Sequence, residues 1–286
     1  MFEQIPQQNA NRQNKIEKKI EETESEQKEK PSEQLTKLLE IISDDLEKEG
    51  LPVDKKARID SKFFEKVYSQ KEIEGDQKKI EELEKQWYKN KNPQQIETEK
   101  EHQIGEKLEA TKTVILNKFM GDRFYVMRTN RYDDVFNKVD NVIMDKKNGE
   151  IVCAFDEVAD IKDKRFYEKR DKVLARNQKG VHLKYGLKME NQEILPSPVK
   201  KLPIFYIALP QKYLDKCLNA LIPNLDTKTE EEKMFFNYTL MVIDHEIQTL
   251  NKSDWEIDDS VLEKIENFSQ TIKNYEKIND LKKPKN

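Results

Sequence analysis

VDNVIMDKKNGEIVCAFDEV, residues 139–158, is the stretch that decides the fold of this 286-residue chain. Two apolar runs, at 139–144 and 151–155, flank a Lys-Asn-Gly segment. Apolar runs on both sides of Asn-Gly are a strong short-range signal for a β-hairpin, so we expect a strand, a tight turn and a second strand. Carboxylates are seldom buried without a partner, so acids set into these strands indicate a metal ion or another cation between them.

The acids in question are Asp140 in the first strand and Asp156 and Glu157 at the end of the second. The hairpin register decides which of them meet. One loop length puts Asp140 opposite Asp156, whereas a two-residue Asn148-Gly149 turn puts Glu157 there. Opposed positions have Cβ atoms roughly 5 Å apart. Both registers therefore bring two carboxylates together at a spacing that suits one shared divalent ion with oxygen ligands.

Helix and strand patterns alternate on both sides of the hairpin. Helical spacing predicts helices over 103–118 and 162–178, and aromatic and branched residues predict a strand over 123–128. The run at 204–208 is short, wholly apolar and preceded by prolines, which predicts a central strand buried on both faces. A helix over 211–221 closes the unit. This order favours an α/β fold, a mixed β-sheet with flanking helices.

In order and spacing these elements resemble the core of the PD-(D/E)XK nuclease-like superfamily. That core has a helix carrying a Glu, a strand, and a hairpin with an Asp on one strand and Asp/Glu-x-Lys on the next. A helix and another strand follow. The resemblance covers the region 94–222 and implies a restriction-endonuclease-like αβββαβ core that uses Mg²⁺ or Mn²⁺.

The resemblance also implies roles for the acids. Asp140, with Asp156 or Glu157, would hold the metal and make up the catalytic acids. Glu106 or Glu109, on the helix over 103–118, would be the superfamily's helical Glu, and Glu106 is taken as a further metal ligand.

The chain departs from the pattern at Val158, which stands where the superfamily has its Lys. That Lys would position or deprotonate the attacking water, so another ammonium must replace it. Lys138 lies two residues before Asp140 and is expected on the same strand face. Lys162 and Lys164, just past the second strand, are the other candidates.

Basic residues follow the acidic hairpin. Residues 161–201 hold twelve Lys or Arg against five Asp or Glu, a balance that attracts a phosphate backbone but that also suits an ordinary solvated face. Arg131 could bind phosphate and Tyr132 could stack on a base. Alternatively, Arg131 pairs with Asp133 or Asp134. The candidate nucleic-acid contacts are Arg131, Tyr132, Lys164, Arg165 and Lys169.

Composition limits the remaining possibilities. With 38% charged and 35% hydrophobic residues, much of the chain must be solvated helix or disorder. There are seven glycines and no Gly-rich phosphate loop, which argues against Walker or Rossmann nucleotide chemistry. Cys153 and Cys217 lie far apart and the three histidines are scattered, so a zinc site is not expected.

The same reasoning divides the chain into four regions. Residues 1–31 are predicted to be disordered, 32–93 to form a helical extension that could dock a protein partner, and 223–286 to form C-terminal helices. Residues 94–222 make the α/β core. We find neither a secretory signal nor an apolar run long enough to span a bilayer, so we expect a cytoplasmic protein without membrane association.

Two functions follow as expectations. The first is a metal-dependent phosphodiesterase, a nuclease-like hydrolase acting on DNA or RNA. The alternative is a catalytically inactive module on the same fold that binds nucleic acid or a protein partner.

Overall fold

The computed structural model describes residues 31–89, 91–92, 94–96, 99, 103–158 and 165–278. The predicted hairpin is present. Strands β2 (Asn141–Asp145) and β3 (Glu150–Val158) pair antiparallel across a turn that ends at Gly149. Gly149 has a φ of +72°, and a Cβ there would fall 2.2 Å from the carbonyl oxygen of Met189. The turn therefore needs glycine both for its backbone conformation and for the close approach of a neighbouring strand.

The sheet is mixed. Strand β1 (Phe124–Arg128) pairs antiparallel with β2, and β8 (Ile204–Ala208) pairs parallel with β3. The prediction of a central position for β8 was wrong, since among the described residues β3 is its only strand neighbour. Its apolar side chains are nevertheless all buried, because helices cover both faces.

Two further antiparallel pairs of short strands follow α7. Strands β5 (Leu187–Glu190) and β6 (Glu193–Pro196) extend the sheet from the start of β3, with Asn191 at the turn between them. Strands β4 (Val181–Leu183) and β7 (Val199–Leu202) form a separate two-stranded sheet.

Helices α5 (Ile104–Met120) and α7 (Arg165–Ala175) cover opposite faces of β3. Lys112 of α5 lies over the ring of Phe155, while Phe166 of α7 contacts Tyr206, the partner of Asp156 in the parallel ladder. Neighbouring residues of a strand point to opposite faces, so Phe155 and Asp156 mark the two sides. The acids at the end of β3 therefore lie between two helices.

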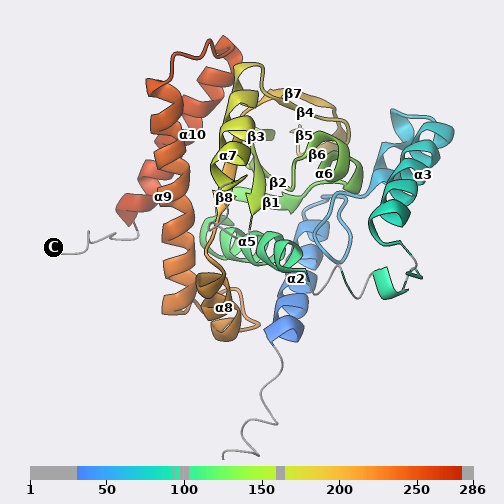
Figure 1. Ribbon diagram of the computed structural model, residues 1–286, viewed down its shortest axis with the longest axis horizontal. Coiled ribbons are helices and arrows are strands. Elements are labelled where there is room, and N and C mark those ends of the chain that lie inside the picture. Colours follow the sequence, from blue (N-terminus) through green and yellow to red (C-terminus); the bar gives the residue numbers. More distant parts are fainter. Residues whose placement is uncertain are drawn as a thin grey trace, which may run out of the picture.

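The C-terminal helices lie on one side of the sheet in Figure 1. They are α8 (Gln211–Ala220), α9 (Glu230–Lys252) and α10 (Asp259–Ile278). Phe268 of α10 stacks on Phe205, which places α10 on the same face as α5. No helix among the described residues combines the length and apolarity needed to cross a bilayer.

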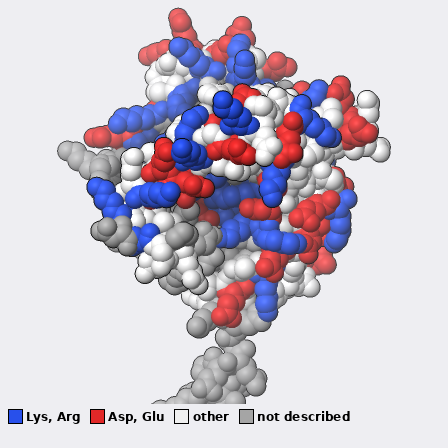
Figure 2. Space-filling view, turned by 90° about the vertical axis from the view of Figure 1, so that its right-hand side faces the viewer, with Lys and Arg blue, Asp and Glu red and all other residues white. Residues whose placement is uncertain are grey.

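The N-terminal extension contains α2 (Pro31–Lys48), the 3-10 helix η1 (Ser61–Lys66) and α3 (Gln70–Trp87). Apolar side chains of α2 belong to the same hydrophobic core as those of α5. Helix α3 lies at the opposite side of the molecule from α9 and α10 (Figure 1). The face on that side mixes Lys and Arg with Asp and Glu, without a patch of one sign (Figure 2). The predicted disorder of 1–31 falls, except for Pro31, outside the described residues.

The polar segment between β1 and β2 forms the short helix α6 (Arg131–Asn137). The side chain of Asn130 accepts a hydrogen bond from the backbone N–H of Tyr132, which is the usual way an N-cap starts a helix.

A buried acid caps the free edge of β8. Glu246 of α9 is 2% exposed, and its Oε2 accepts the N–H of Tyr206 at 2.8 Å. Burial raises the pKa of Glu246 to about 8 from its ordinary value of 4.5. The folded protein thus keeps this proton over a pH range in which the unfolded chain releases it.

We expect the substitution Glu246→Gln to change how stability depends on pH. A carboxyl whose pKa is raised in the folded state favours folding most below pH 4.5, and this advantage declines up to about pH 8. The variant keeps an oxygen that can accept the N–H of Tyr206. As the pH rises across that window, its free energy of unfolding should therefore increase relative to that of the parent by up to about 1.4 kcal/mol per pH unit. Urea unfolding at several pH values measures the slope. Parallel pH profiles for parent and variant would contradict the expectation.

Candidate functional site

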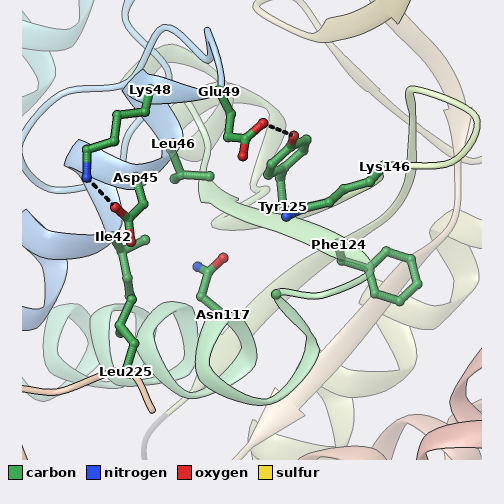
Figure 3. A pocket seen from close by; sticks show the side chains of 11 residues that line it. Ile42, Asp45, Leu46, Lys48, Glu49, Asn117, Phe124, Tyr125, Lys146 and Leu225 are labelled. Carbon is green, nitrogen blue, oxygen red and sulfur yellow. Dashed lines mark hydrogen bonds and ion pairs between the residues drawn. The ribbon is translucent and has the colours of Figure 1, made fainter. Parts of the chain in front are cut away.

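A pocket in the surface lies away from the predicted acids. It is formed by the end of α2, by α5, and by the region around β1 and the loop after β2 (Figure 3). Tyr125 donates its hydroxyl to Glu49 at 3.2 Å, and the Lys146 ammonium lies 4.3 Å from the Tyr125 ring centroid. Tyr125 pairs with Met144, near the end of β2 that is remote from Asp140. The pocket and the acids are therefore separate features.

Asp140 lies immediately before β2 and beside the end of β3. Its N–H donates to the Phe155 carbonyl at 2.8 Å, and its Oδ2 accepts the N–H of Glu157 at 2.9 Å. Asn141 is opposite Phe155, so the register continues to Asp140 beside Asp156. This is the first of the two registers considered from the sequence.

The charge of Asp140 has no counter-charge in direct contact. Its carboxylate makes no ion pair among the described residues. Burial, together with the nearby Glu109 and Asp156 carboxylates, raises the pKa of Asp140 well above its ordinary value. An additional cation at this position would stabilise the ionised form.

Glu157 faces α5. Its carboxylate forms an ion pair with Lys112, whose side chain is fully buried and whose ammonium lies 4.3 Å from the Phe155 ring centroid. Burial lowers the pKa of Lys112 to about 7. Lys112 was not predicted as a site residue, although a lysine two residues before the apolar run 114–116 of a helix expected to pack on the sheet was a visible signal in the sequence.

Asp156 faces α7. The Lys169 Nζ lies 2.8 Å from Asp156 Oδ1 and 3.1 Å from the Glu157 carbonyl oxygen. It also lies 5.1 Å from the ring centroid of Tyr206. Lys169 was predicted to contact nucleic acid. In the structure its ammonium lies against the acids, and 44% of its side chain is exposed.

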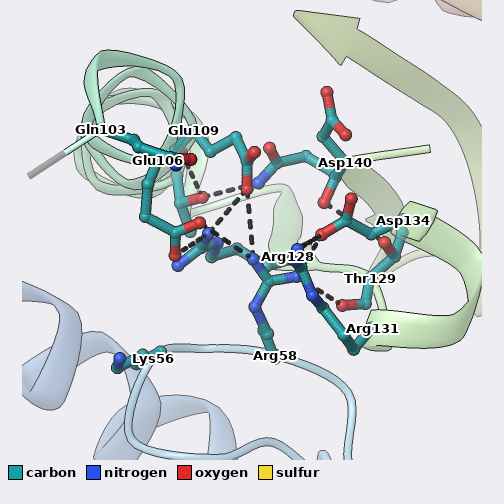
Figure 4. Close-up of polar contacts among 12 residues, drawn as sticks. Lys56, Arg58, Gln103, Glu106, Glu109, Arg128, Thr129, Arg131, Asp134 and Asp140 are labelled. Carbon is teal, nitrogen blue, oxygen red and sulfur yellow. Dashed lines mark hydrogen bonds and ion pairs between the residues drawn. The ribbon is translucent and has the colours of Figure 1, made fainter. Parts of the chain in front are cut away.

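Glu106 and Glu109 project from α5 toward arginines (Figure 4). Both carboxylates pair with Arg128, and both also contact Arg58, which comes from the N-terminal extension. Burial works against ionisation, but Arg128 and Arg58 still hold the pKa of Glu106 at about 2. Glu106 is therefore already compensated by arginine, and Asp140 lies at the margin of this network.

The other candidate ammonium groups are placed differently. The prediction that Lys138 shares a strand face with Asp140 was wrong. Lys138 has a φ of 50°, ends α6 and is exposed, and its carbonyl accepts a hydrogen bond from Arg176. Lys162 and Lys164 lie outside the described residues. Arg165 begins α7, and its side chain is likewise not described.

Arg131 and Tyr132 make contacts within the protein. Arg131 pairs with Asp134 at 2.6 Å, one of the alternatives considered from the sequence, and with Glu84 of α3 at 3.0 Å. The Tyr132 ring is half-buried and lies 4.8 Å from that of Phe136. Neither side chain stands free toward solvent.

Asp140 thus lies beside the end of β3, where Asp156 and Glu157 point to opposite faces of the sheet and each pairs with one lysine of the helix that covers its face. Within the described part of the chain, no three His, Cys, Asp or Glu side chains are grouped closely enough to hold a metal ion by themselves. A cation at Asp140 would thus need the Glu157 backbone carbonyl or water as further ligands.

The comparisons with known proteins found no matching protein-family model, curated protein or solved structure.

Proposed function

We propose that this protein is a metal-dependent phosphodiesterase that cleaves nucleic acid at the Asp140 site. The observation that carries the proposal is the position of Asp140: its carboxylate is fixed on the Glu157 N–H beside Asp156 and has no ion pair among the described residues. The succession α5, β1, β2, β3, α7, β8, with α6 inserted between β1 and β2, strands β4 to β7 inserted before β8, and β8 parallel to β3, supports a PD-(D/E)XK-like core.

The oxygen atoms near Asp140 are of the chemical type that magnesium and manganese bind. They are the carboxylates of Asp140 and Asp156 and the carbonyl oxygen of Glu157, all of them hard oxygen ligands. The Lys169 ammonium already contacts two of these oxygens, so a cation is favoured between them. A bound metal would take over those contacts, and it would polarise the phosphodiester and lower the pKa of a bound water.

Lys169 is the ammonium best placed to orient the attacking water. Lys112 is fully buried beside Glu157, whereas Lys169 is partly exposed and reaches Asp156 from a flexible four-carbon side chain. Once released from Asp156, Lys169 would remain close to the acids and to solvent. This assignment supplies the group that Val158 cannot.

A non-catalytic module that binds nucleic acid is the second candidate. The pairs Lys112–Glu157 and Lys169–Asp156 favour it, because they already neutralise two of the three acids. In this case the lysines act as permanent replacements for a metal, and the surface of α7 binds nucleic acid without cleaving it.

A cleavage assay separates the two candidates. The full chain is incubated with plasmid DNA, single-stranded DNA and single-stranded RNA, with Mn²⁺ or Mg²⁺ and, in parallel, with EDTA. The proposal expects cleavage of at least one substrate that stops with EDTA. Binding without any metal-dependent cleavage would overturn it in favour of the non-catalytic module.

A further inference from the structure

An exposed aromatic ring stands on α7, the helix that supplies Lys169 to the proposed site. Tyr167 is 59% exposed, which is unusual for a large ring with apolar faces. The ring of Phe166 packs edge-on against that of Tyr167, with 4.9 Å between the ring centroids, and its centroid lies 5.7 Å from that of the buried Tyr206. The ring of Tyr167 is therefore held by the core while much of its surface faces solvent.

Charge accompanies the ring. Residues 165–179 contain six Lys or Arg and two Asp or Glu. The guanidinium of Arg170 lies 5.9 Å from the Tyr167 ring centroid, and its exposed contact with Asp171 contributes little stability. An aromatic ring beside cations is the combination that proteins use to bind single-stranded nucleic acid, stacking a base and neutralising its phosphates.

The ring stands on the helix that supplies Lys169 to the acids. Tyr167 lies two residues before Lys169, whose ammonium contacts Asp156 and the Glu157 carbonyl, so the two side chains leave α7 in different directions. Asp156 and Glu157 are only 6% and 8% exposed. A nucleic-acid strand bound along α7 would lie on the same helix that contacts these recessed acids.

We infer that α7 is a platform for single-stranded nucleic acid, with one base stacked on Tyr167 and the adjoining phosphates near Arg170. The inference rests on the proposed function, since it names the substrate class of the same site. Single strands are favoured over duplexes because only an unpaired base can leave its neighbours and stack on a side chain. This role was assigned from the sequence to Tyr132, which is packed against Phe136 instead.

Fluorescence anisotropy tests the platform apart from cleavage. A labelled oligothymidylate is titrated with the full chain in EDTA at low, fixed ionic strength, because phosphate contacts are salt-dependent. The variants are Tyr167→Ala, Tyr167→Phe and a control, Trp87→Ala, which removes a ring of similar exposure (51%) from α3. Loss of one stacked base should weaken binding by about 5- to 150-fold in Tyr167→Ala. Tyr167→Phe and Trp87→Ala should bind like the parent.

An abasic oligonucleotide of equal length provides the second arm. The parent should bind it as weakly as Tyr167→Ala binds oligothymidylate, and Tyr167→Ala should weaken no further. Equal affinity of parent and Tyr167→Ala for oligothymidylate would overturn the platform, as would tighter binding of the matching duplex. Because no metal is present, these binding measurements are independent of cleavage. If the protein binds through Tyr167 but cleaves nothing, only the proposed hydrolysis is wrong. If it cleaves nucleic acid but binding does not depend on Tyr167, only the proposed platform is wrong.

Discussion

Asp140→Asn is expected to abolish metal-dependent cleavage, with a loss of about 10³-fold or more in rate. A catalytic metal contributes several kcal/mol to transition-state stabilisation, and each 1.36 kcal/mol corresponds to a factor of about ten. The variant removes the negative charge that would hold the metal. It keeps an oxygen that can accept the N–H of Glu157, so the local fold should survive.

The plasmid and single-strand assays with Mn²⁺ measure this loss. Glu190→Gln removes an exposed acid on β5 whose ion pair, within the described residues, is with Lys188. It is the charge-matched control and should cleave like the parent. Purifying all three proteins identically also tests for a contaminating nuclease, which would leave equal activity in each preparation. Unchanged cleavage by Asp140→Asn, with an unchanged thermal melt, would remove Asp140 from the site.

Lys112→Met is expected to destabilise the fold by about 3–5 kcal/mol, the usual cost of removing one partner from a buried ion pair. The Glu157 carboxylate is 2% exposed and would lose its cation. The loss arises mainly from the uncompensated charge, because methionine fills a similar volume and can pack against Phe155.

Urea unfolding of the parent, Lys112→Met and the double variant Lys112→Met/Glu157→Met checks this explanation. The double variant should recover most of the lost stability, because it leaves no buried charge behind. A single-variant loss below about 1 kcal/mol, or a double variant as unstable as the single one, would show that packing and not charge governs this position.

The sequence was informative where structure depends on neighbouring residues. The hairpin follows from apolar runs around Asn148-Gly149, and the approach of Asp140 to Asp156 follows from its register. Strand β8 was also predicted correctly, because its apolar run is a local pattern. Its position in the sheet was not predicted, because an apolar run looks the same whether strands or helices lie beside it. In the structure, Glu246 accepts an N–H of β8 that a neighbouring strand would otherwise bind.

The cations at the site could not be predicted in this way. Lys112 and Lys169 come from helices on opposite faces of the sheet, and Arg58 comes from the N-terminal extension. Such pairings depend on tertiary contacts between segments far apart in the chain. Lys138 was misplaced for a local reason: its left-handed backbone ends α6 and removes it from the strand.

Calorimetric titration of metal-free protein with Mn²⁺ shows whether Asp140 and its neighbours hold a metal, independently of any cleavage. We expect a saturable site in the parent and in Glu190→Gln, and its loss in Asp140→Asn. Absence of binding in the parent, or equal binding in Asp140→Asn, would contradict this expectation.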